Sequence, residues 1–408
     1  MNRPAALLVC LLILGGCTAP TATAPTASES SLATQTPTDG PDALPMNESR
    51  VYHRVAVMLD SDVAKPSVRT VDASDFGGSS FGRMVPFVEL LLDADAARDA
   101  TPAAYYEPDA HRVTVLLYDG IPADATNRSE LEATLAHEYA HAVTYRDEQY
   151  HDSMLQAGGG GTTDATQVRW AMIEGTAMYV SDEYSERYLD EFDHGDSIAR
   201  EYHDRNVTWR YALGPYRFGG RYFDRRLGPS ANLTRVYRTP PETTEQLIHD
   251  YPPDSEPPAS LRVSVAKTDS LDAGSNRDTT GKLFVRDLLG AYLVESRAAD
   301  AAAGWGNDRV VTLWDYGANE SNQRNYLWVL RWDDGQNATE FQRAFRDYAT
   351  ARGERVGDDA FRIEGEQFRL ERVSDETVAV VVGHSGLVER TRVASENEIV
   401  SVTVSASA

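Results

Sequence analysis

Three residues near the middle of the chain have the types and spacing of a metal-dependent hydrolase site. His137, Glu138 and His141 form the pattern His-Glu-X-X-His. On a helix, positions i and i+4 lie on one face, so the two imidazoles can share one zinc ion. The carboxylate of Glu138 points slightly aside, where it can accept a proton from a water that zinc has made more acidic. The pattern predicts hydrolysis with Zn²⁺ as cofactor and Glu138 as general base.

A catalytic zinc ion needs a third protein ligand and one open position. The best candidate is Glu174, which lies 33 residues after His141 in the segment Trp170-Ala171-Met172-Ile173-Glu174-Gly175-Thr176-Ala177. Gly175 beside it lets a neighbouring element approach closely. We therefore expect a second helix to bring Glu174 to the two histidines.

His-Glu-X-X-His followed by a Glu-Gly-X-Ala helix resembles the gluzincin metallopeptidases, the group that includes thermolysin and the zinc aminopeptidases. The closest likeness is to the peptidase MA-like surface and secreted proteins, where a Tyr-X-Pro segment and a strand precede the motif. Here these are Tyr106-Glu107-Pro108 and residues 111–118. The resemblance covers roughly residues 100–230, about a third of the chain.

The resemblance implies a role for each matching residue. His137, His141 and Glu174 would bind zinc. Glu138 would act as general base and then as general acid toward the leaving amine. The strand before the helix would pair with the substrate backbone. Thermolysin-like enzymes also have an aspartate four residues after the ligand glutamate, which orients a ligand histidine, but Met178 stands there in this chain. Another group must then orient the histidine.

The transition state also needs a donor for the developing oxyanion. Zinc aminopeptidases are similar to this chain in having a Tyr-X-X-Gly segment ahead of a helix that ends in glycine. Tyr211, in Tyr211-Ala212-Leu213-Gly214, is our first choice. Tyr216 is the rival and His203 a further candidate, while either tyrosine could equally be a half-buried packing residue. The remaining histidines of this region are expected to be solvated rather than ligands: His151, His194 and His249.

Periodicity predicts the elements that must position these residues. Residues 51–60 and 111–118 are expected to be strands. Residues 129–145, with Ser129 as N-cap, 167–188 and 211–227 are expected to be helices. The fold class is α+β, and the resemblance implies a zincin-like metallopeptidase domain with a small mixed sheet and active-site helices.

A second α+β region should follow. Its expected elements are a helix over 281–303, strands over 310–314 and 326–332, a helix over 338–351, and a hairpin of 367–373 with 377–382. In between, Gly304 is expected to cap a helix C-terminus and Trp305 to be a structural anchor, with a substrate-facing edge as the alternative. We predict a metallopeptidase domain at 47–238, a Pro- and Asp-rich linker or long loop at 239–260, and a C-terminal domain at 261–408.

The N-terminus predicts export and membrane attachment. Arg3 precedes a short apolar run that ends in Leu14-Gly15-Gly16-Cys17, which resembles a lipoprotein signal. Residues 1–17 would then be a signal peptide with Cys17 as the lipidation site, and the Thr/Pro/Ala-rich residues 18–46 a flexible stalk. Apart from the lipidated Cys17, the mature chain would contain no cysteine and therefore no disulfide.

The composition resembles that of proteins from extreme halophiles, such as a haloarchaeal surface protein, and a merely acidic mesophilic protein is the alternative. The 408 residues carry a net charge of -24, and the chain has three lysines: Lys65, Lys267 and Lys282. Such a negative body disfavours nucleic acid as a partner. Six Asn-X-Ser/Thr sequons predict N-glycosylation, namely Asn47, Asn127, Asn206, Asn232, Asn319 and Asn337.

Two functions follow from these observations. The first is a lipid-anchored, extracellular zinc metallopeptidase acting on peptides or proteins. The alternative is a surface glycoprotein whose metal site is inactive or structural, with a role in binding or in organising the cell envelope. A substrate-binding lipoprotein of a transporter would explain the anchor but not the histidine motif.

Overall fold

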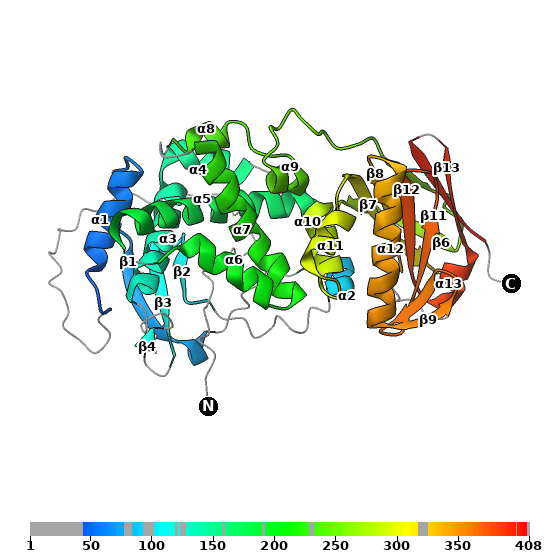
Figure 1. Ribbon diagram of the computed structural model, residues 1–408, viewed down its shortest axis with the longest axis horizontal. Helices are drawn as coiled ribbons and strands as arrows, with labels where there is room; N and C mark the ends of the chain where they lie inside the picture. The colour runs from blue at the N-terminus through cyan, green and yellow to red at the C-terminus, as the bar shows by residue number, and fades with distance from the viewer. Residues whose placement is uncertain are drawn as a thin grey trace. The chain divides into compact units, whose positions relative to one another are not determined.

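The computed structural model describes residues 44–76, 84–92, 102–118, 121–122, 128–156, 160–189, 192–227, 232–316, 325–396 and 398–405. These residues have a mixed α+β structure (Figure 1). The chain divides into two compact units. The first contains Met1–Arg83, Ala97–Glu148 and Val180–His194, and the second contains Met84–Ala96, Gln149–Tyr179 and Gly195–Ala408. Cys17 lies outside the described residues.

The first unit contains a small mixed sheet in the order β1-β3-β2, with β4 pairing with β3. The strand β3 (Arg112–Tyr118) confirms the predicted strand at 111–118. It pairs in parallel with β1 (Ser67–Asp72) and antiparallel with β2 (Ala104–Glu107) and β4 (Ile121–Pro122). Pairing with β1 and β2 fixes the register of β3, and the register determines which of its side chains are buried.

The predicted strand at 51–60 is wrong, because this segment is the helix α1 (Glu48–Met58). The side chain of Asn47 caps it by accepting a hydrogen bond from the backbone N–H of Arg50 at 3.0 Å. Val51 and Val55 are both fully buried, and their i, i+4 spacing places them on one face of a helix. The valines that suggested alternation therefore follow the helical period.

The helix α3 (Arg128–Arg146) confirms the predicted helix around the histidine motif. Ser129 as its N-cap is wrong, because the helix begins at Arg128 and Ser129 lies inside it. It packs against α1 and against β2 of the sheet. The ring of Tyr139 meets that of Tyr52 edge to face, with centroids 5.3 Å apart. Burial continues without a break from Leu131 to Tyr145, so α3 is a central helix of the first unit.

Most of the other helices belong to the second unit. The predicted helices at 167–188 and 211–227 are confirmed within α5 (Thr163–Tyr188) and α7 (Val207–Leu227). The remaining helices up to residue 301 are α2 (Pro86–Leu92), α4 (Glu148–Gln156), α6 (His194–Asp204), α8 (Thr234–Tyr237), α9 (Thr244–His249), α10 (Gly281–Gly290) and α11 (Glu295–Ala301). The expected single helix at 281–303 is wrong, because Val294 has an extended backbone that separates α10 from α11.

A seven-stranded antiparallel sheet dominates the second unit, in the order β6-β7-β8-β12-β11-β10-β9. The helix α12 (Gly335–Arg352) covers one face (Figure 1). The structure confirms the strands expected at 310–314 and 326–332 and the hairpin of 367–373 with 377–382, all of which lie in this sheet. It also confirms the helix expected at 338–351, which is α12. Its strands are β6 (Leu271–Asp278), β7 (Trp305–Asp315), β8 (Asn325–Trp332), β9 (Glu354–Gly357), β10 (Ala360–Ile363), β11 (Glu366–Arg372) and β12 (Thr377–Gly383).

A second sheet of three strands packs on the other face of the large sheet. Its order is β13 (Thr391–Glu396), β14 (Ile399–Val404) and β5 (Arg262–Val265). Apolar side chains of both sheets and of α13 (Ser385–Arg390) form one core cluster, which includes Val263, Val311 and Val402. The strand β5 follows the expected linker at 239–260, and that segment contains α9 and lies within the second unit. The predicted domain boundaries stay a prediction.

Asp308 connects the large sheet to α10. Its buried carboxylate accepts hydrogen bonds from the backbone N–H groups of Thr280 and Gly281 at 2.8 and 2.9 Å, at the start of that helix. The indole N–H groups of Trp305 and Trp328 donate to it at 3.2 and 3.1 Å. The expected structural role of Trp305 is thereby confirmed. Gly304 is not itself the helix cap, because α11 ends at Ala301 with Ala302 as its cap.

The three lysines differ in exposure. The ammonium group of Lys282 lies 3.0 Å from the carboxylate of Glu245, and both side chains are nearly fully buried. Lys65 pairs with Glu48, and Lys267 pairs with Asp272 at the surface.

Among the described residues, no helix has the length and apolar content needed to cross a membrane.

Candidate metal centre

The helix α3 brings the two motif histidines together. His137 and His141 are 0% and 1% exposed. Their Nε2 atoms lie 3.0 Å apart, and the two rings are nearly perpendicular with centroids 4.7 Å apart. Burial lowers the pKa of His141 to about 3, so its ring stays neutral and keeps a lone pair for a metal ion. The two imidazoles thus direct the same ring atom to one region.

Glu174 completes a set of three donors. It lies on α5, it is 1% exposed, and one of its carboxylate oxygens lies within 4.8 Å of a ring nitrogen of each histidine. Two zinc ligands at about 2.0–2.1 Å from a tetrahedral ion are separated by about 3.3 Å, so this spacing fits one shared ion. Two imidazole nitrogens and a carboxylate oxygen are also a donor set that zinc accepts. The buried triad of His137, His141 and Glu174 could therefore hold a metal ion.

The position of Glu174 depends on a close helix crossing beside it. A Cβ atom added to Gly175 would lie 2.4 Å from the carbonyl carbon of Gly219 in α7, and one added to Gly219 would lie 2.4 Å from the carbonyl oxygen of Ala171. Any side chain at either glycine would clash with backbone atoms. One residue further on, the Thr176 hydroxyl lies 2.5 Å from the Tyr237 hydroxyl of α8. These contacts fix the turn of α5 that carries the third donor.

Glu138 follows His137 directly on α3 and is 1% exposed. A carboxylate beside a metal ion can take a proton from a water molecule there. Its place on the same buried helical turn is what the role of general base requires.

His194 is the residue that the sequence reasoning missed. We expected it to be solvated, but it is 7% exposed, and its ring lies edge to face on that of His137 with centroids 5.6 Å apart. Its Nδ1 atom lies 3.0 Å from the Ser181 hydroxyl of α5, and burial lowers its pKa to about 4. His194 begins an amphipathic helix, which is an ordinary place for a surface histidine, so the sequence offered no signal.

The three candidates for an oxyanion donor lie in different surroundings. Tyr211 is buried, its ring packs edge to face on Phe284 of α10 at 6.0 Å, and burial raises its pKa well above the usual value. Tyr216 is also buried on α7. His203 is more than half exposed and lies 2.6 Å from Glu295 of α11. Tyr211 as the oxyanion donor stays a prediction.

Met178 shows what replaces the aspartate of thermolysin-like enzymes. The Met178 side chain is 1% exposed, and a Cβ atom added to Gly220 of α7 would lie 3.0 Å from the Cβ atom of Met178. Position 178 therefore faces α7 and has an apolar packing role. His194 occupies a place against His137 from which it can fix the orientation of that ring.

The sequons differ in accessibility. Asn47, Asn206 and Asn232 are exposed, and the first two accept capping hydrogen bonds through Oδ1. Asn337 is half-buried, and its amide lies against Gly304. Asn127 and Asn319 lie outside the described residues.

The comparisons with known proteins concern mainly the large sheet. Residues 268–392 match a family described as a domain of unknown function (DUF8575). That segment begins just before β6 and ends in β13, so it contains the large sheet and lies beyond the metal triad. No curated protein and no solved structure matches the chain.

Proposed function

We propose that this protein is a zinc-dependent metallopeptidase that hydrolyses peptide bonds in peptides or proteins. The observation that carries the proposal is the convergence of His137 Nε2, His141 Nε2 and a Glu174 oxygen in a buried triad, with Glu138 on the same turn of α3 as the first histidine. A structural metal site does not need a buried carboxylate next to its ligands, whereas metal-assisted hydrolysis needs one as the general base. The α+β content of the described residues is compatible with a zincin-like domain.

The chain's own residues supply most of the proposed chemistry. Zinc, when bound, would act as a Lewis acid toward water and the scissile carbonyl. The Glu138 carboxylate would accept a proton from water as the water oxygen bonds to the carbonyl carbon. It would then give that proton to the nitrogen as the carbon–nitrogen bond breaks, which releases a carboxylic acid and an amine. Tyr211 is our candidate for the donor that stabilises the oxyanion.

The proposed setting follows from the N-terminal segment and the charge. A lipid on Cys17 would hold the protein on the outer face of a cell membrane, and the stalk at 18–46 would separate the folded body from the lipid surface. The net charge of -24 and the three lysines support a protein that works in high salt, where ions screen the repulsion among carboxylates.

A structural metal site in a surface glycoprotein is the second candidate function. The observation that favours it is the depth of the triad, since none of its three side chains is more than 1% exposed. A structural ion is enclosed by protein, whereas a catalytic ion keeps an open position for water and substrate. This function would include the same ligands but no turnover.

One experiment separates the two functions. Metal content and hydrolysis of an unstructured protein are measured in high salt for the native chain and for Glu138→Gln, which keeps the shape of the side chain and removes its basicity. Bound zinc in both proteins, with hydrolysis in the native chain alone, supports the peptidase. Bound zinc in both proteins with no hydrolysis by either supports the structural site. Absence of bound zinc from the native chain overturns both.

A further inference from the structure

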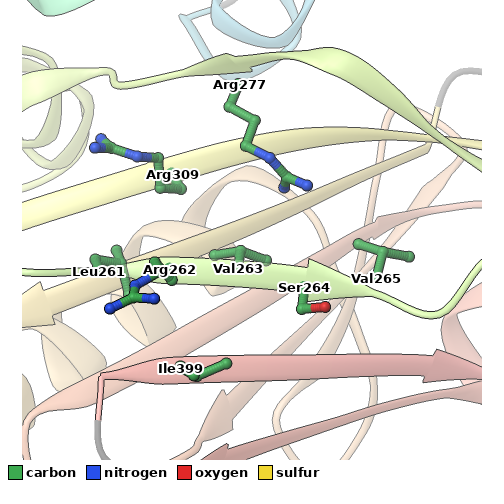
Figure 2. A pocket seen from close by; sticks show the side chains of 8 residues that line it. All are labelled: Leu261, Arg262, Val263, Ser264, Val265, Arg277, Arg309 and Ile399. Atoms are coloured by element: carbon green, nitrogen blue, oxygen red, sulfur yellow. The ribbon is translucent and has the colours of Figure 1, made fainter.

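A groove of about 540 Å³ lies along the edge of the three-stranded sheet, and none of the metal triad lines it (Figure 2). Its floor is β5. Ile399 of β14 lies on one side of this strand, and Arg277 of β6 and Arg309 of β7 lie on the other side. Arg262 on β5 also lines it. The groove therefore combines a sheet edge with three arginines.

The backbone of β5 is paired on one side. It runs parallel to β14, with Arg262 opposite Ile399 and Val265 opposite Val402. The N–H of Arg262 donates to Glu398 and that of Ala266 to Val402, at 3.0 and 2.9 Å. In a parallel pair, alternate residues direct both their N–H and C=O groups to one neighbour. The N–H and C=O groups of Val263 and Val265 therefore point to the groove, and within the described residues β5 pairs with no other strand.

The arginines of the groove form no close ion pair with a carboxylate in the part of the chain that the structure describes. Among the residues that the structure describes, no carboxylate lies within ion-pair distance of Arg262, Arg277 or Arg309. Arg309 donates to the Asn307 side chain and the Asp308 backbone oxygen at 2.9 and 2.8 Å, and also to the Thr279 hydroxyl. Its charge opposes the rise that burial causes in the pKa of Asp278, while no charged acceptor lies within hydrogen-bond distance of it in the described residues. Arginines elsewhere bind carboxylates closely, as Arg112 and Arg346 do. In a chain of net charge -24, three such cations at one groove form a local positive patch.

We propose that this groove binds an extended acidic peptide segment of another protein, which adds to β5 as a fourth strand. The peptide backbone would exchange hydrogen bonds with Val263 and Val265, as in other cases of strand addition. Carboxylates on alternate residues of that segment would meet Arg277 and Arg309, because alternate side chains of a strand share one face.

Charge selects this occupant over a second copy of the chain. Two β5 edges that paired with each other would bring six arginines together, and like charges facing each other destabilise a strand pair. An exposed edge needs protection from such pairing, and the arginines supply it. A partner segment with acidic side chains would instead form ion pairs with the same arginines.

The test uses the full chain and two fluorescent, end-capped hexapeptides of alternating valine and a charged residue, one with glutamate and one with lysine. Affinity is measured by fluorescence anisotropy at several salt concentrations. We expect the glutamate peptide to bind and the lysine peptide to bind at least tenfold more weakly. Arg277→Gln should weaken binding of the glutamate peptide by roughly five- to tenfold. Arg343→Gln, an exposed arginine on α12, is the matched control and should leave the affinity unchanged.

A second pair of variants tests strand addition itself. Val265→Pro removes an N–H that points to the groove and spares the hydrogen bonds to β14, so it should abolish binding. Val265→Ala removes the side chain alone and should change the affinity less than threefold. If Val265→Pro does not fold, N-methylation of the peptide on alternate residues replaces it. Methylation in one of the two registers should then abolish binding, and methylation in the other should not.

Several results would overturn the proposal. Equal binding of both peptides would exclude recognition of acidic side chains. An equal loss in Arg277→Gln and Arg343→Gln would show attraction to overall charge. Unchanged binding in Val265→Pro, or in both N-methylated peptides, would show a simple anion site without strand addition. A concentration-dependent dimer that Val265→Pro dissociates would identify a second copy as the occupant.

Discussion

Gly175 of α5 and Gly219 of α7 meet with no space for a side chain on either. A Cβ atom on Gly175 would lie 2.4 Å from the carbonyl carbon of its neighbour. Because the next residue back is Glu174, this crossing determines where the third donor of the triad lies. The close packing of α5 against α7 therefore also fixes the position of Glu174.

The first prediction concerns that crossing. Gly175→Ala should separate α5 from α7 and move Glu174, which we expect to cost about 1–3 kcal/mol of unfolding free energy and most of the metal affinity. Thermal unfolding and metal content measure the two effects. Gly161→Ala is the control, because a Cβ atom there meets nothing within 4 Å. Normal metal binding by a folded Gly175→Ala protein would contradict the prediction.

The second prediction concerns the third ligand. Glu174→Ala should lower zinc affinity by at least about a hundredfold, since a buried site would lose one of three donors and its negative charge. Glu186→Ala, an exposed carboxylate on the same helix, should retain the affinity of the native chain. Competition with a chromophoric chelator measures both. Equal affinities for the two variants would remove Glu174 from the site.

The third prediction concerns His194, which packs on the ring of His137. His194→Ala should reduce metal affinity by roughly tenfold, because His137 would lose a contact that fixes its ring. His194→Phe keeps a ring in that place and should restore part of the affinity. The absorption spectrum of bound Co²⁺ reports the ligand geometry in each variant. A spectrum and affinity identical to those of the native chain in His194→Ala would show that His194 has no positioning role.

The fourth prediction concerns pH and the buried carboxyl of Asp287 on α10. Burial raises its pKa to about 7, while the Tyr202 hydroxyl that donates to it opposes the shift. An acid with a raised folded pKa binds more protons in the folded state, so its contribution to stability is greatest below the unfolded pKa of 3.8 and is lost as pH rises toward 7. Asp287→Asn should remove this loss.

The check is denaturant unfolding at pH 5.5 and 8.5 in high salt. From pH 5.5 to 7, Asp287 accounts for about 2 kcal/mol of lost stability, at about 1.4 kcal/mol per pH unit. Asp287→Asn should therefore gain about that much on the native chain between the two pH values. Asp358→Asn, on the surface, should follow the native profile. A parallel profile for Asp287→Asn would refute the assignment.

The local parts of the site could be predicted from the sequence, because its signals are local. His137 and His141 are one helical turn apart, and Glu174 lies in its own helical motif, so spacing alone placed them on α3 and α5. His194 depends on a tertiary contact with His137 that no spacing encodes. The helix α1 was mistaken for a strand because Val51, Val55 and Val57 all lie an even number of residues apart, as in a strand. Val51 and Val55 also fit the helical period, whereas Val57 is exposed.

The three-stranded sheet was not predicted from the sequence, for a different reason. The strand β5 pairs with β14 across more than 130 residues, and its four residues alternate over too short a segment to identify a strand. Such pairing is decided by the core that Val263 and Val402 share. Burial in that core, rather than local propensity, makes the segment a strand.

The burial of Lys282 against Glu245 has a practical consequence for physical measurements. With that amine enclosed, the accessible lysine side chains are Lys65 and Lys267, and each compact unit contains one of them. An amine-reactive probe should therefore label one lysine in each unit without engineered cysteines. Energy transfer between two such dyes would report the distance between the units directly, in whatever salt the protein requires.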